Sequence, residues 1–244
     1  MFGYNTIRSF SEIDWNRFQD SVYQSIDNEI QKNSDDYILN VCEEDYISYL
    51  VEKHSFVPIS VDKDTENVHE PEEFEEELGN YNSYGFSRYG RYRSGYRIKI
   101  SYSFTGDSEL FKVRPSSFFL NSYDIIVDTV NNTVSFEILV YSQDVLEFER
   151  EKNSVYNRAF ANIDKMENCI EGFNSGLRDI INHKFKIEKE KRKSKNNFFA
   201  AIKVRKSSSS PSTYGVPVIQ KKKMSKPTVG VNKQYTVEPT LDIT

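Results

Sequence analysis

The chain has 244 residues, of which 37% are hydrophobic and 14% are aromatic, and its formal net charge is −5. This aromatic content excludes a fully disordered chain, because disordered segments contain few aromatic residues. No run approaches the roughly 20 apolar residues that span a bilayer, the amino-terminal sequence lacks the apolar run of a signal peptide, and two cysteines cannot build a disulfide framework. These features favour a cytoplasmic protein with no membrane segment.

The amino-terminal part of the chain is predicted to be helical. Residues 11–30 carry apolar side chains at helical spacing, and they begin with Ser11, a residue type that caps helices. Residues 35–53 show the same spacing and predict one or two further helices. The segment FVPISVD, at 56–62, is a candidate strand.

The next segment, 63–95, shows neither the strand nor the helix period, and we expect a mobile loop there. It contains seven acids and no Lys or Arg between Glu66 and Glu77, and the part after Pro71 is expected to form a brief helix. A Tyr- and Arg-rich segment follows at 81–97. It has the composition of a contact with single-stranded nucleic acid, or it folds back on the acidic run before it.

A small antiparallel sheet is predicted in the middle of the chain. Residues 97–105 alternate between apolar and polar side chains, as a half-buried strand does. Residues 125–140 predict a hairpin that turns at the two asparagines 131–132, because Asn tolerates the positive φ angles of a two-residue turn. That turn would pair Val127 with Phe136.

The longest helical region is 144–193. Apolar residues recur there at alternating spacings of three and four between 156 and 180, which is the repeat of a coiled coil. A break near Asn153 or Gly172 would divide the region into a helical hairpin. The apolar stripe either packs on its own domain or forms the seam of a homo-oligomer or of a complex with a protein partner.

These elements predict an α+β domain over 1–206, followed by a linker and an extended tail over 207–244. No nucleotide-binding, hydrolase or metalloprotease motif occurs. A zinc site needs ligands at close spacing, and the cysteines and histidines show no such grouping: Cys42, Cys169, His54, His69 and His183. We therefore predict no catalytic residue, metal or cofactor, with an enzyme whose site assembles from distant residues as an alternative.

Nucleic-acid binding is a further alternative, carried by basic residues. The stretch 183–206 is rich in Lys and Arg, which neutralise phosphates. The same residues suit a solvated helix end, where they offset the helix dipole. The candidate nucleic-acid contacts are Arg91, Arg93, Arg97, Lys189, Lys191, Arg192 and Lys193.

A series of short landmarks occurs in order along the second half of the chain. They are Gly106-Asp107, Leu110-Phe111, Pro115-Ser116, Asn174, Leu177, Lys189 to Lys193, Gly215-Val216-Pro217 and Glu238-Pro239. Their order resembles the amino-terminal region of bacterial proteins that carry a restriction-endonuclease-like nuclease domain at the carboxy terminus. The resemblance covers about residues 97–240 and carries over no catalytic residue, because the nuclease motif has no counterpart here. It implies a non-catalytic binding or regulatory module, the sensor or adaptor part of a bacterial anti-phage defence system.

Overall fold

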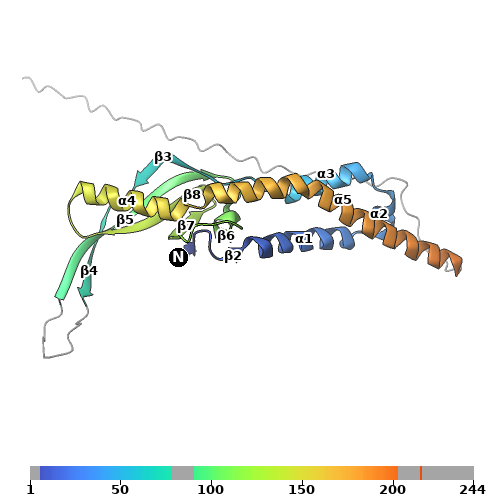
Figure 1. The fold of residues 1–244 in the computed structure, drawn as a ribbon, viewed down its shortest axis with the longest axis horizontal. Coiled ribbons are helices and arrows are strands. Elements are labelled where there is room, and N and C mark those ends of the chain that lie inside the picture. The colour runs from blue at the N-terminus through green and yellow to red at the C-terminus, as the bar shows by residue number, and fades with distance from the viewer. Residues whose placement is uncertain (1–5, 79–90, 203–214, 216–244) are drawn as a thin grey trace, which may run out of the picture.

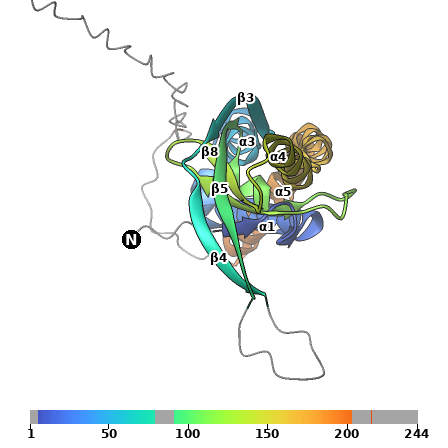
Figure 2. The same ribbon diagram turned by 90° about the vertical axis from the view of Figure 1, so that its left-hand side faces the viewer.

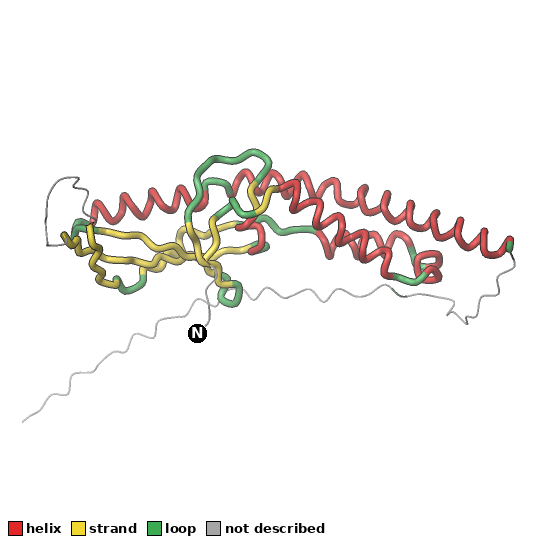
Figure 3. Tube along the Cα trace, turned by 90° about the horizontal axis from the view of Figure 1, so that it is seen from below, coloured by secondary structure: helices red, strands yellow, loops and turns green. Residues whose placement is uncertain are grey.

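The structure is a computed structural model, and it describes residues 6–78, 91–202 and 215. Strands gather at one end of the molecule and helices at the other, and a long helical rod runs along both (Figures 1 and 3). The predicted α+β class is confirmed. The elements are β1 (Thr6–Arg8), β2 (Ile13–Asp14), α1 (Trp15–Lys32), α2 (Asp35–Asn40), α3 (Glu43–His54), β3 (Ser60–Val68), β4 (Glu72–Leu78), β5 (Arg91–Thr105), a 3₁₀ turn (Ser108–Lys112), β6 (Val113–Arg114), β7 (Asp124–Asp128), β8 (Thr133–Val140), α4 (Val145–Phe160) and α5 (Ile163–Ala201).

The amino-terminal helices form where the apolar spacing predicts them, but α1 begins later than Ser11. Residues 13 and 14 pair in parallel with β6 as the short strand β2, so the helix begins only at Trp15. The second helical segment is two helices, α2 and α3, and the predicted strand at 56–62 begins at Ser60.

The main sheet is antiparallel in the order β1-β7-β8-β5-β3, with β4 paired to the outer part of β5. The strand predicted over 97–105 is confirmed, and its alternate residues Ile98, Ile100, Tyr102 and Phe104 are buried. These side chains belong to a single apolar core that also includes residues of α1, α3, α4 and α5. Because α4 and α5 lie on one side of the strands (Figure 2), the other face of the sheet carries polar side chains.

The mobile loop predicted over 63–95 is wrong for the residues that the structure describes. In its described part this segment forms the end of β3, all of β4 and the beginning of β5, and the brief helix predicted after Pro71 is wrong. Pairing explains the difference, since β4 places Glu72 opposite Arg97 and Glu76 opposite Arg93, and opposite charges across two strands stabilise their pairing. Residues 91–97 of the Tyr- and Arg-rich segment thus pair with the acidic run, and residues 79–90 lie outside the described residues.

The hairpin at 125–140 is confirmed, but its predicted register is wrong by two residues. Val127 pairs with Val134 instead of Phe136, and the turn covers 129–132. A shift of two residues leaves every side chain on the same face of the sheet. The apolar pattern is therefore satisfied equally well by both registers and does not distinguish between them.

The side chain of Asp128 accounts for the longer turn. Its carboxylate accepts hydrogen bonds from the backbone N–H groups of Val130 and Asn131, at 2.9 and 3.1 Å. It also accepts one from the side-chain amide of Asn131, at 2.7 Å. These hydrogen bonds hold residues 129–132 in a turn, so strand pairing stops at Asp128 and Thr133 and does not continue to the two asparagines. Of the two asparagines in the turn, Asn132 takes the positive φ angle, at 51°.

The long helical region is confirmed, as α4 followed by α5 in nearly the same direction (Figure 1). The break falls at residues 161–162, and neither Asn153 nor Gly172 interrupts a helix. The buried residues of α5 are Met166, Ile170, Phe173, Leu177, Ile181, Phe185 and Arg192. From Leu177 to Phe185 the buried residues are four apart and no longer alternate between spacings of three and four, so the coiled-coil repeat does not continue. The buried stripe packs on α1, α2 and α3 of the same chain.

Candidate functional site

The basic stretch of α5 lies against the acidic sides of the amino-terminal helices. Lys184 is 2.5 Å from Asp27 of α1, and Lys189 is 3.3 Å from Glu43 at the start of α3. Lys195 is 3.2 Å from the carboxylate of Asp35 at the start of α2. These charges therefore help to hold the helical half of the molecule together.

Arg192 has a structural position that the sequence does not indicate. It is only 5% exposed, and its guanidinium donates to the backbone carbonyl oxygens of Asn33 at 2.6 Å and Gln31 at 3.0 Å. It also donates to the carboxylate of Glu188 at 2.9 Å. The last carbonyls of a helix have no partner within the helix, so Arg192 satisfies the carboxy-terminal end of α1.

The other candidate nucleic-acid contacts are spread over both ends of the molecule. Lys191 and Lys193 are exposed and pair with acids one turn earlier on α5. Arg93 lies on β5 with its guanidinium 3.5 Å from the centre of the Tyr141 ring, and Arg97 is also on β5. The side chain of Arg91 lies outside the described residues. The structure does not bring the seven candidates together on one surface.

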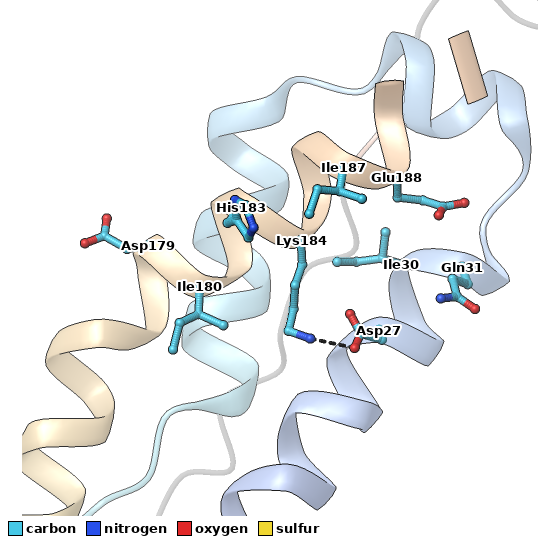
Figure 4. Close-up of a pocket in the computed structure, with 9 residues that line it drawn as sticks. All are labelled: Asp27, Ile30, Gln31, Asp179, Ile180, His183, Lys184, Ile187 and Glu188. Atoms are coloured by element: carbon cyan, nitrogen blue, oxygen red, sulfur yellow. Dashed lines mark hydrogen bonds and ion pairs between the residues drawn. The ribbon is translucent and has the colours of Figure 1, made fainter. Parts of the chain in front are cut away.

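A groove of about 660 Å³ lies between α1 and α5 (Figure 4). Its apolar lining includes Ile30, Ile180 and Ile187, and the ion pair between Lys184 and Asp27 crosses it. The figure shows these side chains extending from both helices into the space between them. The groove is a gap between the side chains of α1 and α5, and no segment among the described residues fills it.

A more distinctive surface is the connection between β6 and β7, which projects beside the helices (Figure 2). It presents three consecutive apolar side chains, Phe118, Phe119 and Leu120, with exposed fractions of 40%, 54% and 91%. We call residues 118–120 the apolar loop. Residues 118–121 are not in a strand.

The backbone of the apolar loop is fixed by one buried side chain, that of Asn162. Its Oδ1 accepts a hydrogen bond from the N–H of Phe119 at 2.8 Å. Its Nδ2 donates to the carbonyl oxygens of Phe119 at 3.1 Å and Asn121 at 3.2 Å. Asn162 lies at the break between α4 and α5. The position of this break therefore determines where Asn162 contacts the apolar loop.

Cations flank the two aromatic rings of the apolar loop. The guanidinium of Arg114 lies 4.9 Å from the centre of the Phe118 ring, and the ammonium of Lys165 lies 5.6 Å from that of Phe119. Arg114 also pairs with Asp14. Both distances are within the range of a favourable cation–π interaction, which helps to orient the exposed rings.

A polar cluster around Glu29 connects α1 to α3. The Glu29 carboxylate accepts hydrogen bonds from Lys53 at 2.6 Å and Tyr49 at 3.1 Å, and it lies 3.0 Å from Nε2 of His54. Burial acts to raise the pKa of Glu29, but the hydrogen bonds from Lys53 and His54 outweigh it and hold this pKa below its usual range. The cluster keeps a charged carboxylate between two helices and stabilises their packing.

Two landmarks of the sequence resemblance also have structural roles. Gly106 has a φ of +96°, and a Cβ there would lie 2.1 Å from the carbonyl oxygen of Pro58, so only glycine fits. The Asn174 side chain accepts from the N–H of Phe56 at 3.1 Å and donates to its carbonyl oxygen at 2.8 Å. Asn174 therefore fixes the chain after α3, much as Asn162 fixes the apolar loop.

Among residues 6–78, 91–202 and 215, no group of three or more His, Cys, Asp or Glu side chains is placed to hold a metal ion. In the same residues, no helix has the length and apolar content needed to cross a membrane. Comparison with protein-family models, curated proteins and solved structures found no match.

Proposed function

We propose that this chain is a non-catalytic binding module that recognises a protein partner through the apolar loop. The observation that carries the proposal is the combination of exposure and order at 118–120. Large exposed apolar side chains mark interaction surfaces when they are contiguous, and aromatic residues supply much of the binding energy of protein interfaces. Because Asn162 already holds the backbone, little conformational entropy is lost when a partner binds.

The charges beside the apolar loop indicate the chemistry of the partner. Lys165 lies next to the Phe119 ring, whereas Arg114, next to Phe118, already pairs with Asp14. The complementary surface is therefore an apolar pocket with an acidic residue opposite Lys165. A second copy of this chain is less suitable. In a twofold dimer the same patch meets itself, which would bring the Lys165 side chains of both copies to one interface.

The resemblance of residues 97–240 to bacterial proteins with a carboxy-terminal nuclease domain supports a role in anti-phage defence. In that setting the chain acts as a sensor or adaptor, and the partner is the component that it regulates. The nucleic-acid alternative at 183–206 gains no support from the geometry, because Arg192 is buried and several lysines are paired with acids of other helices.

Site-specific photo-cross-linking in the cell that naturally makes the chain tests this proposal. A photoreactive phenylalanine analogue replaces Phe119 in one variant and Leu146, which is 78% exposed at the start of α4, in a matched control. We expect a discrete adduct from position 119 and none from position 146. The adduct's partner, identified by mass spectrometry and purified, should bind the unmodified chain. Replacing all three apolar residues by serine should weaken this binding at least about tenfold.

Two outcomes contradict the proposal. Absence of an adduct at position 119, or the same adducts at both positions, would show that the apolar loop has no specific partner. An adduct with twice the mass of the chain would identify a second copy as the occupant and overturn the assignment of a different partner protein.

A further inference from the structure

A hollow between the sheet and α4 suggests a second binding site, whose lining does not include residues 118–120. Its volume is about 600 Å³, within the range of about 300–1,000 Å³ typical of small-molecule sites. Three arginines line it, and they come from three separate elements: Arg8 from β1, Arg97 from β5 and Arg158 from α4. Only Arg97 belongs to the candidate residues that the sequence indicates.

The three guanidinium groups use few of their hydrogen-bond donors within the described residues. Arg8 donates from Nε to the hydroxyl of Ser122 at 2.9 Å, and Arg158 donates to Glu151 at 3.4 Å. Arg97 is 3.8 Å from the carboxylate of Glu137, which is beyond hydrogen-bond distance. Since each guanidinium has five N–H donors, most of them remain available to a ligand.

Arginine donors in this number favour phosphate or carboxylate groups, which accept two parallel hydrogen bonds from one guanidinium. Three arginines and two carboxylates, those of Asp124 and Glu137, line the hollow, so its lining has an excess of positive charge that favours an anion. The arginines lie on two strands and a helix, so their positions are set by regular structure rather than by a flexible loop.

The rest of the lining indicates that the anion carries a neutral, partly apolar portion. Ile126 and Leu139 supply apolar surface, and the ring of Tyr123 lies 5.1 Å from the guanidinium of Arg158. The carboxylates of Asp124 and Glu137 also line the hollow, and they would repel a simple anion while accepting hydrogen bonds from hydroxyl or amino groups. A sugar with hydroxyls and a planar base satisfies these groups together with the arginines.

We propose that this hollow binds a nucleoside polyphosphate, with Arg8, Arg97 and Arg158 holding the phosphates. Asp124 and Glu137 accept hydrogen bonds from the sugar or the base, and the apolar residues contact the base. The site lies beside β1, β5, β7 and β8, and α4 contributes Arg158 to it. It requires no change in the apolar loop, so either proposal can fail without the other.

Isothermal titration calorimetry with ATP, AMP, adenosine and inorganic phosphate tests the site, each measured with and without Mg²⁺. We expect ATP to bind with a dissociation constant below about 1 mM and the other three ligands to bind more weakly. The variants Arg97→Gln and Arg158→Gln should each weaken ATP binding about tenfold or more, because each removes charge-assisted hydrogen bonds. The matched control is Arg150→Gln, an exposed arginine two turns earlier on α4. Thermal melts of all three variants check that they are folded.

The proposal is overturned if ATP does not bind up to about 5 mM, a concentration above even weak specific affinities. Equal ATP affinity in Arg97→Gln, Arg158→Gln and the unmodified chain would overturn it as well. Inorganic phosphate binding as tightly as ATP would contradict the nucleoside assignment. Binding of a single-stranded oligonucleotide without binding of ATP would indicate a nucleic-acid contact instead.

Discussion

Phe119 beside the sheet and Phe198 near the end of α5 are exposed to a similar degree, 54% and 59%. Their surroundings differ. The backbone of Phe119 is fixed on both sides by Asn162, whereas Phe198 lies on α5 beyond Arg192, the last buried residue of that helix. Exposure alone therefore does not single out Phe119, and what distinguishes it is that it belongs to three consecutive exposed apolar residues.

The charged residues of the two regions differ in the same way. In the helical half, Lys184, Lys189 and Lys195 pair with acids of α1, α2 and α3, so these basic charges serve packing. In the sheet half, Arg8 and Arg97 line a hollow, and their polar side-chain contacts there are Ser122 for Arg8 and Glu137 for Arg97. The described part of the basic stretch 183–206 therefore mainly stabilises the packing of the helices. The candidate anion site is formed instead by arginines that are far apart in the sequence.

The largest expected effect tests whether the helical half is held together by burial. Ile170 is fully buried on α5, and replacing it by alanine should lower the free energy of unfolding by about 2–5 kcal/mol, through lost apolar contact and the cavity left behind. Urea melts measure this, with the exposed neighbour Glu171→Ala as the control. A loss of less than about 0.5 kcal/mol, the range of ordinary surface substitutions, would show that the stripe is not core.

A smaller effect separates structural from solvated basic residues on α5. Arg192→Ala leaves the carbonyls at the end of α1 and the carboxylate of Glu188 without their donor, and we expect a loss of about 3 kcal/mol. Lys193→Ala removes only an exposed ion pair with Glu190 and should cost less than about 1 kcal/mol. Equal losses for the two variants, measured in denaturant melts, would refute the capping role of Arg192.

A pH series tests the cluster that joins α1 to α3. The folded pKa of Glu29 lies below its unfolded value of about 4.3, so the ionised carboxylate contributes stability above that pH. This contribution is lost as pH falls through the folded pKa. Glu29→Gln should cost about 1.5–3 kcal/mol at pH 7, and the difference from the unmodified chain should shrink toward pH 3.

The exposed Glu167→Gln on α5 is the control for general effects of acid. Other carboxylates also have a lowered pKa, such as Glu66 and Asp128. Their protonation at low pH lowers the stability of the unmodified chain and of the Glu29 variant by the same amount. A stability difference that stays constant between pH 7 and pH 3 would mean that the charge of Glu29 does not support the helix contact.

The elements that the sequence predicts well are those whose signal is local. The alternation over 97–105 and the apolar spacing over 144–193 identify a strand and a helical region, because each pattern depends only on neighbours in the chain. The register of the hairpin is different. It depends on the hydrogen bonds of Asp128, and the two registers bury the same faces, so the side-chain pattern cannot select between them.

The features that the sequence does not predict depend on partners far along the chain. The acidic strand β4 is stabilised by arginines of β5, and isolated from them it resembles a solvated helix. Arg192 satisfies carbonyls of α1, and Asn162 holds residues 119–121. The arginine-lined hollow likewise combines β1, β5 and α4. None of these arrangements leaves a periodic signal.

Hydroxyl-radical footprinting of the chain in its own cell, compared with the purified chain, tests the central claim most directly. It reports the solvent accessibility of Phe119 and Phe198, two residues of the same type and similar exposure. If the apolar loop is the docking surface, oxidation of Phe119 falls in the cell while oxidation of Phe198 stays unchanged. Equal oxidation of Phe119 in both settings, or protection of Phe198 alone, would contradict the claim and move the interaction surface to the helical half.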